Sequence, residues 1–219
     1  MTDAAGVRVW DVPTRLVHWL IVVLVGASWW TGETGRLEWH RWSGYTLTGV
    51  VLFRLYWGFF GSSTARFSRF VSGPRGVIDY LRGRWTVAAG HNPLGSWSVV
   101  VLILLLVTQV ALGLFAVDVD GIESGPLSMY VSFEMGRICA RLHNLVFNGL
   151  LVLIAVHIAA VLFYQVFRKE NLVGGMVTGK RALRGEGVTP VLGASWIRLI
   201  VGIVVASTIT WLIARAFQF

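Results

Sequence analysis

Long stretches without a charged residue dominate the pattern of the chain and predict helices that cross a membrane. Five spans are nearly free of Asp, Glu, Lys and Arg: residues 16–32, 42–61, 93–117, 142–167 and 199–214. The second span runs from 42 to 54 and continues to 61, and Arg54 is the one charged residue within these spans. A hydrocarbon core of about 30 Å requires about 20 helical residues. The third and fourth spans, of 25 and 26 residues, exceed this length, and the fifth reaches it if Arg198 and Arg215 snorkel to the interfaces. The pattern therefore predicts five membrane helices.

The composition supports this prediction and excludes several other classes. Of the 219 residues, 55% are hydrophobic and only 14% are charged, with a mean hydropathy of +0.68. These values exclude a disordered chain and argue against nucleic acid as the partner that explains the net charge of +8. Cys139 is the single cysteine, which excludes an internal disulfide, a cysteine-built zinc site and the C-x-x-C-H attachment of a c-type haem. Any haem would be held without covalent links.

Local signals refine the ends of the spans. Asp11 before Pro13 and Asn92 before Pro93 predict helix starts. The first span follows basic residues, as a signal peptide would, but the tryptophans at its end fit an interfacial belt better, so we expect it to be a retained helix. Most tryptophans lie near span ends and are interpreted as interface anchors: Trp10, Trp29, Trp30, Trp39, Trp42, Trp57, Trp97, Trp196 and Trp211.

The distribution of basic residues predicts the orientation of the spans. Twelve Lys and Arg residues fall before the first span, between the second and third, and after the fourth, against five in the other connections and at the C-terminus. By the positive-inside rule, the N-terminus is cytoplasmic and the C-terminus lies outside. The excess of positive charge is therefore mainly an orientation signal.

Four of the five histidines lie in or at the ends of apolar spans, where an ionisable side chain is by default functional. His143 and His157 are 14 residues apart, which on a helix means about 21 Å along the axis and about 40° around it. In an antiparallel arrangement, His157 meets His18 on the cytoplasmic side and His143 meets His40 on the outer side. Two facing imidazole pairs fit two b-type haems, with one histidine on either side of each iron. Such iron has no open position and passes single electrons.

Two other interpretations of the histidines remain open. They could line a path for protons or transition-metal ions, although such paths usually combine histidine with buried Asp or Glu. None of the eleven acidic residues lies inside a charge-free span, which favours haem. The histidines could also have a structural role, as hydrogen-bonding partners of neighbouring helices.

Arg54 and Gly44 are the next candidates for cofactor binding. Arg54 lies 14 residues after His40, and so on nearly the same helix face but at the inner leaflet. There it either pairs with a haem propionate or snorkels to the cytoplasmic surface. Gly44, one turn after His40, either lets a flat macrocycle approach the helix or is one of the glycines common in membrane helices. His91, the fifth histidine, is interpreted as a loop residue.

Together these residues resemble the bacterial cytochrome b561 family, including the b-type cytochrome subunits of nickel-iron hydrogenases. Besides His40 and Gly44, the matching stretches read VWDVPTRLVHW at 9–19, RLYWGF at 54–59, GHNP at 90–93, HN at 143–144, HI at 157–158, ENLV at 170–173 and MVTG at 176–179. The resemblance implies an all-α four-helix membrane bundle in residues 1–180 that holds two b haems. It implies one haem on His18 and His157 and the other on His40 and His143. Residues 181–219 depart from the family pattern and are expected to form a cytoplasmic linker and an extra transmembrane helix.

The resemblance also implies a function and a location. Family members pass electrons in the respiratory chain of the bacterial inner membrane, between a quinone and a hydrogenase, a c-type cytochrome or another dehydrogenase. Some instead oxidise superoxide and reduce ubiquinone without a partner. The outer loops carry five basic and six acidic residues, which favours the partner-served function over capture of an anion. For the quinone site, the loop near His91 and the connection at 129–135 are the two options.

Overall fold

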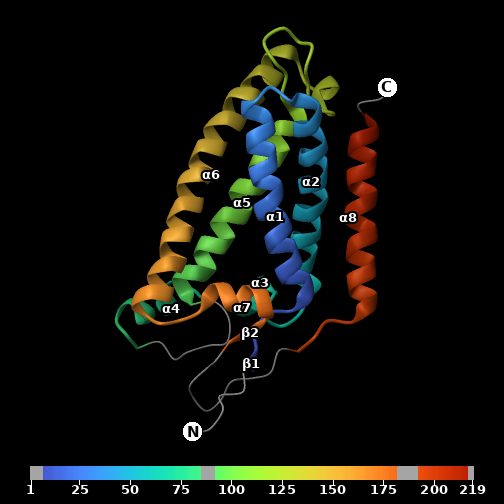
Figure 1. Ribbon diagram of the computed structural model, residues 1–219. Coiled ribbons are helices and arrows are strands. Elements are labelled where there is room, and N and C mark those ends of the chain that lie inside the picture. Colours follow the sequence, from blue (N-terminus) through green and yellow to red (C-terminus); the bar gives the residue numbers. More distant parts are fainter. Residues whose placement is uncertain (1–6, 85–91, 182–191, 217–219) are drawn as a thin grey trace. The chain divides into compact units, whose positions relative to one another are not determined.

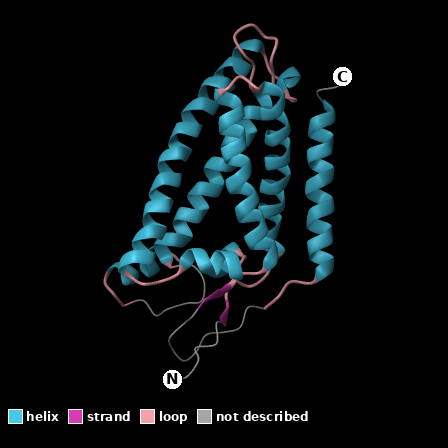
Figure 2. Ribbon diagram, viewed as in Figure 1, coloured by secondary structure: helices cyan, strands magenta, loops and turns pink. Residues whose placement is uncertain are grey.

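Helices account for most of the chain, as the apolar spans predict (Figures 1 and 2). The computed structural model describes residues 7–84, 92–181 and 192–216. The helices in these ranges are α1 (Val12–Glu33), α2 (Leu37–Phe60), α3 (Phe67–Phe70), α4 (Pro74–Leu81), α5 (Pro93–Phe115), α6 (Phe133–Phe167), α7 (Leu172–Thr178) and α8 (Trp196–Ala216). The other elements are a 3-10 turn at Ser128–Tyr130 and two short strands, β1 (Val7–Arg8) and β2 (Lys180–Arg181). The all-α fold class is confirmed.

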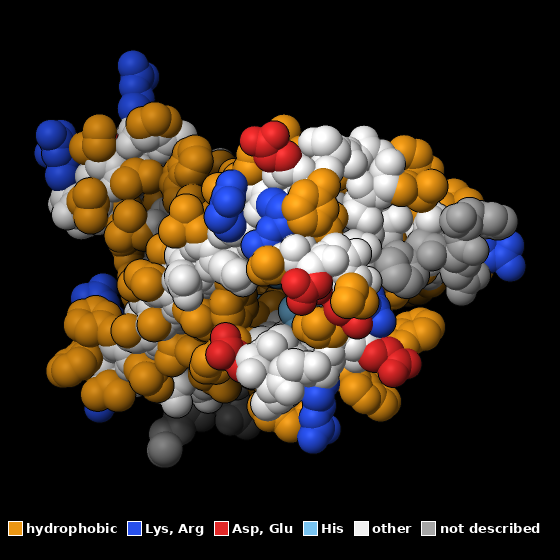
Figure 3. Space-filling model, turned by 90° about the horizontal axis from the view of Figure 1, so that it is seen from above, with side chains coloured by type: hydrophobic (Ala, Val, Ile, Leu, Met, Phe, Trp, Pro, Cys, Tyr) orange, Lys and Arg blue, Asp and Glu red, His pale blue; other side chains and the backbone are white. Residues whose placement is uncertain are grey.

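Four helices within the described ranges, α1, α5, α6 and α8, are long and apolar enough to cross a membrane. They coincide with four of the five predicted spans, and α8, with 21 residues, is longer than expected. α2 forms over the remaining span and has 24 residues, but Arg54 and its hydroxyl-bearing side chains make it less apolar. Figure 3 shows the molecule from above, where hydrophobic side chains lie among charged and other residues. Along the long helices many large hydrophobic side chains are exposed, as expected where lipid surrounds them. The chain is a multi-pass membrane protein.

The contacts divide the chain into two compact units. The first unit comprises Met1–Val17, Arg54–Val101 and Ala155–Ile200. The second unit comprises His18–Phe53, Leu102–Ile154 and Val201–Phe219. Each long helix therefore contributes one part to each unit.

In the first unit, the start of the chain is bonded to the segment that follows α7. β1 pairs antiparallel with β2. The backbone N–H groups of Val9 and Trp10 both donate to the carbonyl of Gly179, at 2.8 and 3.2 Å. Gly179 ends α7 with a φ of 81°, a left-handed conformation that glycine adopts without steric cost. These bonds hold the N-terminal segment against the end of α7.

Both predicted helix starts in the first unit are confirmed. α1 begins after Asp11, whose Oδ1 accepts from the backbone N–H of Thr14 at 2.7 Å. α5 begins at Pro93, and Oδ1 of Asn92 accepts from the backbone N–H of Gly95 at 2.7 Å. Each cap satisfies one of the N–H groups that the first turn of a helix leaves without a partner.

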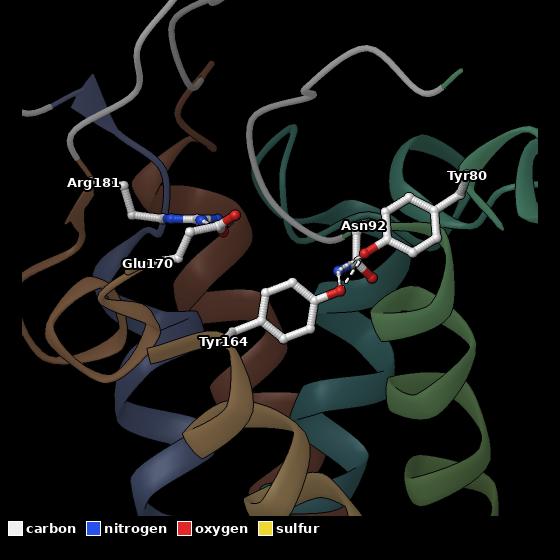
Figure 4. A network of polar contacts seen from close by, with 5 residues as sticks. All are labelled: Tyr80, Asn92, Tyr164, Glu170 and Arg181. Atoms are coloured by element: carbon white, nitrogen blue, oxygen red, sulfur yellow. Dashed lines mark hydrogen bonds and ion pairs between the residues drawn. The ribbon is translucent and has the colours of Figure 1, made fainter. Parts of the chain in front are cut away.

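A hydrogen-bonded network in the first unit joins α4 to the start of α5 and the end of α6 (Figure 4). The hydroxyls of Tyr80 and Tyr164 are hydrogen-bonded to each other. Nδ2 of Asn92 donates to the hydroxyl of Tyr164 at 2.9 Å and to that of Tyr80 at 3.3 Å. The same view shows Arg181 paired with Glu170 at 2.7 Å. Burial and the bond to Tyr164 raise the pKa of Tyr80 to about 12.

In the second unit, α1 contacts both α2 and α6. The hydroxyls of Ser28 on α1 and Ser43 on α2 are hydrogen-bonded at 2.8 Å. The ring centroids of Trp29 on α1 and Phe147 on α6 lie 6.3 Å apart. These contacts bring together the helices that carry the candidate residues of this unit.

α8 packs against α2 in the second unit through small residues. A Cβ added to Gly49 on α2 would lie 3.1 Å from Oγ1 of Thr210 on α8. Gly202 and Ala206, two turns and one turn before Thr210, are the buried residues of α8. Small residues let membrane helices approach closely, so the fifth helix is packed on the protein through this part of its surface.

Two tryptophans interpreted as interface anchors are instead buried inside the protein. Trp10 is 6% exposed and Trp57 is 3% exposed, and the Nε1 of Trp57 donates to Oδ2 of Asp11 at 2.9 Å. The anchor interpretation was therefore wrong for these two residues, because a partner within the chain replaces the membrane interface. The remaining tryptophans of that set are exposed: Trp29, Trp30, Trp39, Trp42, Trp97, Trp196 and Trp211.

The raised pKa of Tyr80 gives a test of the network. Because its folded pKa of about 12 lies above the ordinary value of 10, the neutral phenol contributes stability that is fully present below pH 10 and is lost as the pH rises through 12. We expect Tyr164→Phe to remove the hydrogen bond and lower the pKa of Tyr80 towards its ordinary value. Ultraviolet difference spectra of the phenolate band measure this, with Tyr80→Phe identifying the contribution of Tyr80. An unchanged titration in Tyr164→Phe would contradict the assignment.

Candidate functional site

His40 and His143 face each other in the second unit. His40 lies in the first turn of α2, and His143 lies on α6, ten residues after its start. Their ring centroids are 6.1 Å apart, and the ring planes meet at 80°. Both side chains are half-buried. The structure thus brings together these two candidate ligands.

A backbone carbonyl fixes each of the two rings. Nδ1 of His40 lies 2.8 Å from the carbonyl oxygen of Ser28 on α1. Nδ1 of His143 lies 2.9 Å from the carbonyl oxygen of Gln109 on α5. Because a carbonyl oxygen only accepts, each Nδ1 carries the hydrogen and donates it. The neutral ring then keeps its lone pair on Nε2, where a metal can bind.

A glycine follows each acceptor carbonyl by one helical turn and makes room for the ring. Gly32 follows Ser28 by four residues, and its added Cβ would lie 3.2 Å from Nδ1 of His40. Gly113 follows Gln109 by four residues, and its added Cβ would lie 2.9 Å from Cε1 of the His143 ring. A side chain at either position would push the imidazole from its carbonyl. The same arrangement occurs on two different helices.

The separation of the two rings fits a metal between them. A metal–imidazole bond of about 2 Å on each side places two ring centroids roughly 6 Å apart, and the observed distance is 6.1 Å. In the part of the chain that the structure describes, no cluster of three or more His, Cys, Asp or Glu side chains could hold a bare metal ion. Two opposed imidazoles suit haem iron, because the macrocycle supplies the other ligands.

Two further features surround His40. A Cβ added to Gly44, one turn later on α2, would meet no atom within 4 Å, so the helix surface is open there. Arg41 forms an ion pair with Glu123 of the connection between α5 and α6. The open surface at Gly44 suits the approach of a flat group, and the ion pair ties the start of α2 to that connection.

His18 and His157 belong to different units. His18 is half-buried on α1 in the second unit, with its ring edge-on to Trp19 at 5.1 Å between centroids. His157 is half-buried on α6 in the first unit, on the same helix as His143. The predicted spacing of 14 residues on one helix is confirmed for His143 and His157.

Arg54 is buried in the first unit, with 7% of its surface exposed. Its guanidinium carbon lies 5.1 Å from the ring centroid of Phe67. Its Nη1 is buried and has no hydrogen-bond partner among the residues that the structure describes. This burial argues against snorkelling to the surface. A buried cation with an unsatisfied donor suits an anion that the chain does not itself supply, such as a haem propionate.

Of the two options for a quinone site, the connection at 129–135 lies within the described residues. His91 lies outside the described residues. In the other option, at 129–135, the side chains of Met129 and Tyr130 are 60% and 68% exposed.

Sequence reasoning missed the groups that hold the two imidazoles. The acceptors are backbone carbonyls, which leave no trace in residue type. The only available signal was a glycine on α1 and another on α5, and glycine is common in membrane helices. The hydrogen bond of Asp11 with Trp57, 46 residues away, was also missed, since each residue had a simpler explanation as a helix start or an interface anchor.

Comparison with protein families finds a match over most of the chain. The family described as prokaryotic cytochrome b561 matches residues 9–179, which is most of the chain and includes all four candidate ligands. No curated protein and no solved structure shows a significant match. On the strength of the family match, this chain belongs to the prokaryotic cytochrome b561 family.

Proposed function

We propose that the protein passes electrons through two b-type haems between the quinone pool and a redox partner, which is a hydrogenase, a c-type cytochrome or another dehydrogenase. Membership of the family supports the coarser function, which is transmembrane electron transfer with b-type haem. The facing pair of His40 and His143, each with Nδ1 bonded to a carbonyl and Nε2 left for a metal, carries the finer proposal.

In this proposal, His40 and His143 hold one haem and His18 and His157 hold the other. The position of His157 on α6, 14 residues after His143, supports the second assignment, because it places two ligands on nearly one helix face about 21 Å apart along the axis. Two ligands so separated suit one haem near each side of a membrane.

Arg54 and Gly44 complete the proposed cofactor site. The unpartnered Nη1 of buried Arg54 donates to a propionate, which also neutralises the buried charge. The open helix surface at Gly44 accommodates the edge of a macrocycle. Haem supplies a one-electron iron couple when bound, while the chain orients the ligands and sets the local charge.

The arrangement in the membrane follows from the distribution of charge. The N-terminus is cytoplasmic and the C-terminus periplasmic in the bacterial inner membrane, as the positive-inside rule predicts. Residues 1–180 form the haem domain, supported by the hydrogen bonds that Val9 and Trp10 make with Gly179. Residues 181–219 form a linker and the added helix α8, which contacts lipid and packs on α2.

Haem content tests the ligand pairs. We expect the purified protein to show reduced-minus-oxidised bands of b-type haem. We expect His40→Ala and His143→Ala to lose the same haem and His18→Ala to lose the other, so that the haem content of each variant falls by half. Leu145→Ala, a change at a side chain that is 65% exposed on α6, is the matched control and should keep both. A spectrum without b-type bands would contradict the proposal.

The glycines that face the rings give a second test. We expect Gly113→Ala to lower the content of the haem held by His40 and His143, because the added Cβ would lie 2.9 Å from Cε1 of the His143 ring. Gly149→Ala on α6 is the control, since its Cβ would meet no atom within 4 Å. Haem content equal in the two variants would show that the carbonyl contact is dispensable.

Reaction with quinone tests the partner-served function. We expect the haems to exchange electrons rapidly with a short-chain quinone and its quinol, measured by stopped-flow absorbance. Superoxide as the faster reductant, with quinone as acceptor, would support the partner-free superoxide oxidation known in some family members and contradict the partner-served proposal.

A further inference from the structure

The carboxylate of Asp11 joins two helices of the first unit. Its Oδ1 caps α1 by accepting from the backbone N–H of Thr14 at 2.7 Å. Its Oδ2 accepts from Nε1 of Trp57 on α2 at 2.9 Å. Trp57 is 3% exposed, so this bond is shielded from competing solvent. Each carboxylate oxygen therefore already has a donor within the protein.

Arg54 lies three residues before Trp57 on α2, so the two side chains are neighbours on the helix surface. The bond to Trp57 places the Asp11 carboxylate beside the turn of α2 that carries Arg54. Yet no ion pair within 4 Å joins Arg54 to any acidic residue in the described ranges. The Asp11 carboxylate therefore lies near Arg54 without pairing with it, and Nη1 stays without a partner among the described residues.

A bond between a carboxylate and an arginine is stronger than one between a carboxylate and an indole, because both partners are charged. In a buried site this difference grows, since little solvent screens the charges. Without the indole N–H, Oδ2 of Asp11 would lose its donor, and the nearby guanidinium would be the strongest replacement.

We propose that Trp57 is a positioning residue that holds the Asp11 carboxylate away from Arg54 and so keeps the guanidinium available for an external carboxylate, the haem propionate. This inference rests on the proposed function, because it assumes a propionate at Arg54. It assigns Trp57 and Asp11 a joint role that neither a helix start nor an interface anchor requires.

The redox potential of the haem reports on this arrangement. A guanidinium bound to a propionate offsets its negative charge and favours the reduced iron, which carries less positive charge. If Asp11 captures Arg54, the propionate loses that partner and the potential falls. If Asp11 is neutral, no capture is possible, and removal of the indole has little effect.

The experiment is a double-variant cycle of Trp57→Phe and Asp11→Asn on the haem-loaded protein, read by optical redox titration. Asn at position 11 can still cap α1 through its side-chain oxygen but carries no charge. We expect a negative shift of one haem potential in Trp57→Phe. In the Asp11→Asn background, we expect the same substitution to give little or no shift. Trp42→Phe on α2, at a tryptophan that is 60% exposed, is the matched control and should leave both potentials unchanged.

The outcomes separate this inference from the proposed function. An equal shift of Trp57→Phe in both backgrounds would show a merely structural role of the indole, and no shift in the wild-type background would also overturn the inference. If Trp57→Phe loses the haem, recovery of haem content on adding Asp11→Asn supports the inference, and lack of recovery opposes it. Arg54→Gln should shift the same potential negatively. If it shifts neither potential, the propionate assignment itself fails.

Discussion

An imidazole inside a membrane helix bundle has no water to bond with, so each ring must find a partner in the protein. A helical carbonyl can supply one, because its second lone pair remains free after the helical hydrogen bond is made. Such an oxygen is normally shielded by the side chain one turn later. At Ser28 and Gln109 that later residue is glycine, and an imidazole from a neighbouring helix takes the place of the missing Cβ. The rest of the candidate site depends on this contact, because it fixes both the tautomer and the direction of the rings.

The first unit meets a different constraint, which is the placement of a permanent charge. Burying a guanidinium costs several kcal/mol unless an anion compensates it. A direct ion pair would compensate Arg54 but would also consume its donors. In the observed arrangement the carboxylate of Asp11 is bonded to Trp57 near Arg54, the ring of Phe67 lies beside the guanidinium, and Nη1 is unsatisfied. A site for an anionic cofactor needs this kind of incomplete internal pairing, since complete pairing would leave no hydrogen-bond donor for the cofactor.

The sequence predicts the helices well, because charge-free length and capping residues such as Asp11 and Asn92 are local properties. It also predicts that His40 and His143 meet, since helix direction and depth follow from the order of the spans. It does not predict that α6 begins at Phe133, nine residues before its apolar stretch, because the charges in that extra part give no membrane signal. Nor does it predict which carbonyl receives each imidazole, or that Trp57 turns towards Asp11. Those choices depend on the rotation of one helix against another, which residue types alone do not determine.

The hydrogen bonds from Val9 and Trp10 to Gly179 impose an order on biosynthesis. Gly179, the partner of Val9, is made 170 residues after it, once α6 and α7 have been synthesised. At translation rates of about 5–20 residues per second, the N-terminal strand waits on the order of ten seconds or longer for that partner. Four long helices are synthesised in that interval, so β1 cannot pair with β2 before the last of them, α6, is complete. A ribosome stalled between the end of α6 and Gly179 would therefore hold a chain in which α1, α2, α5 and α6 can insert while β1 still has no partner.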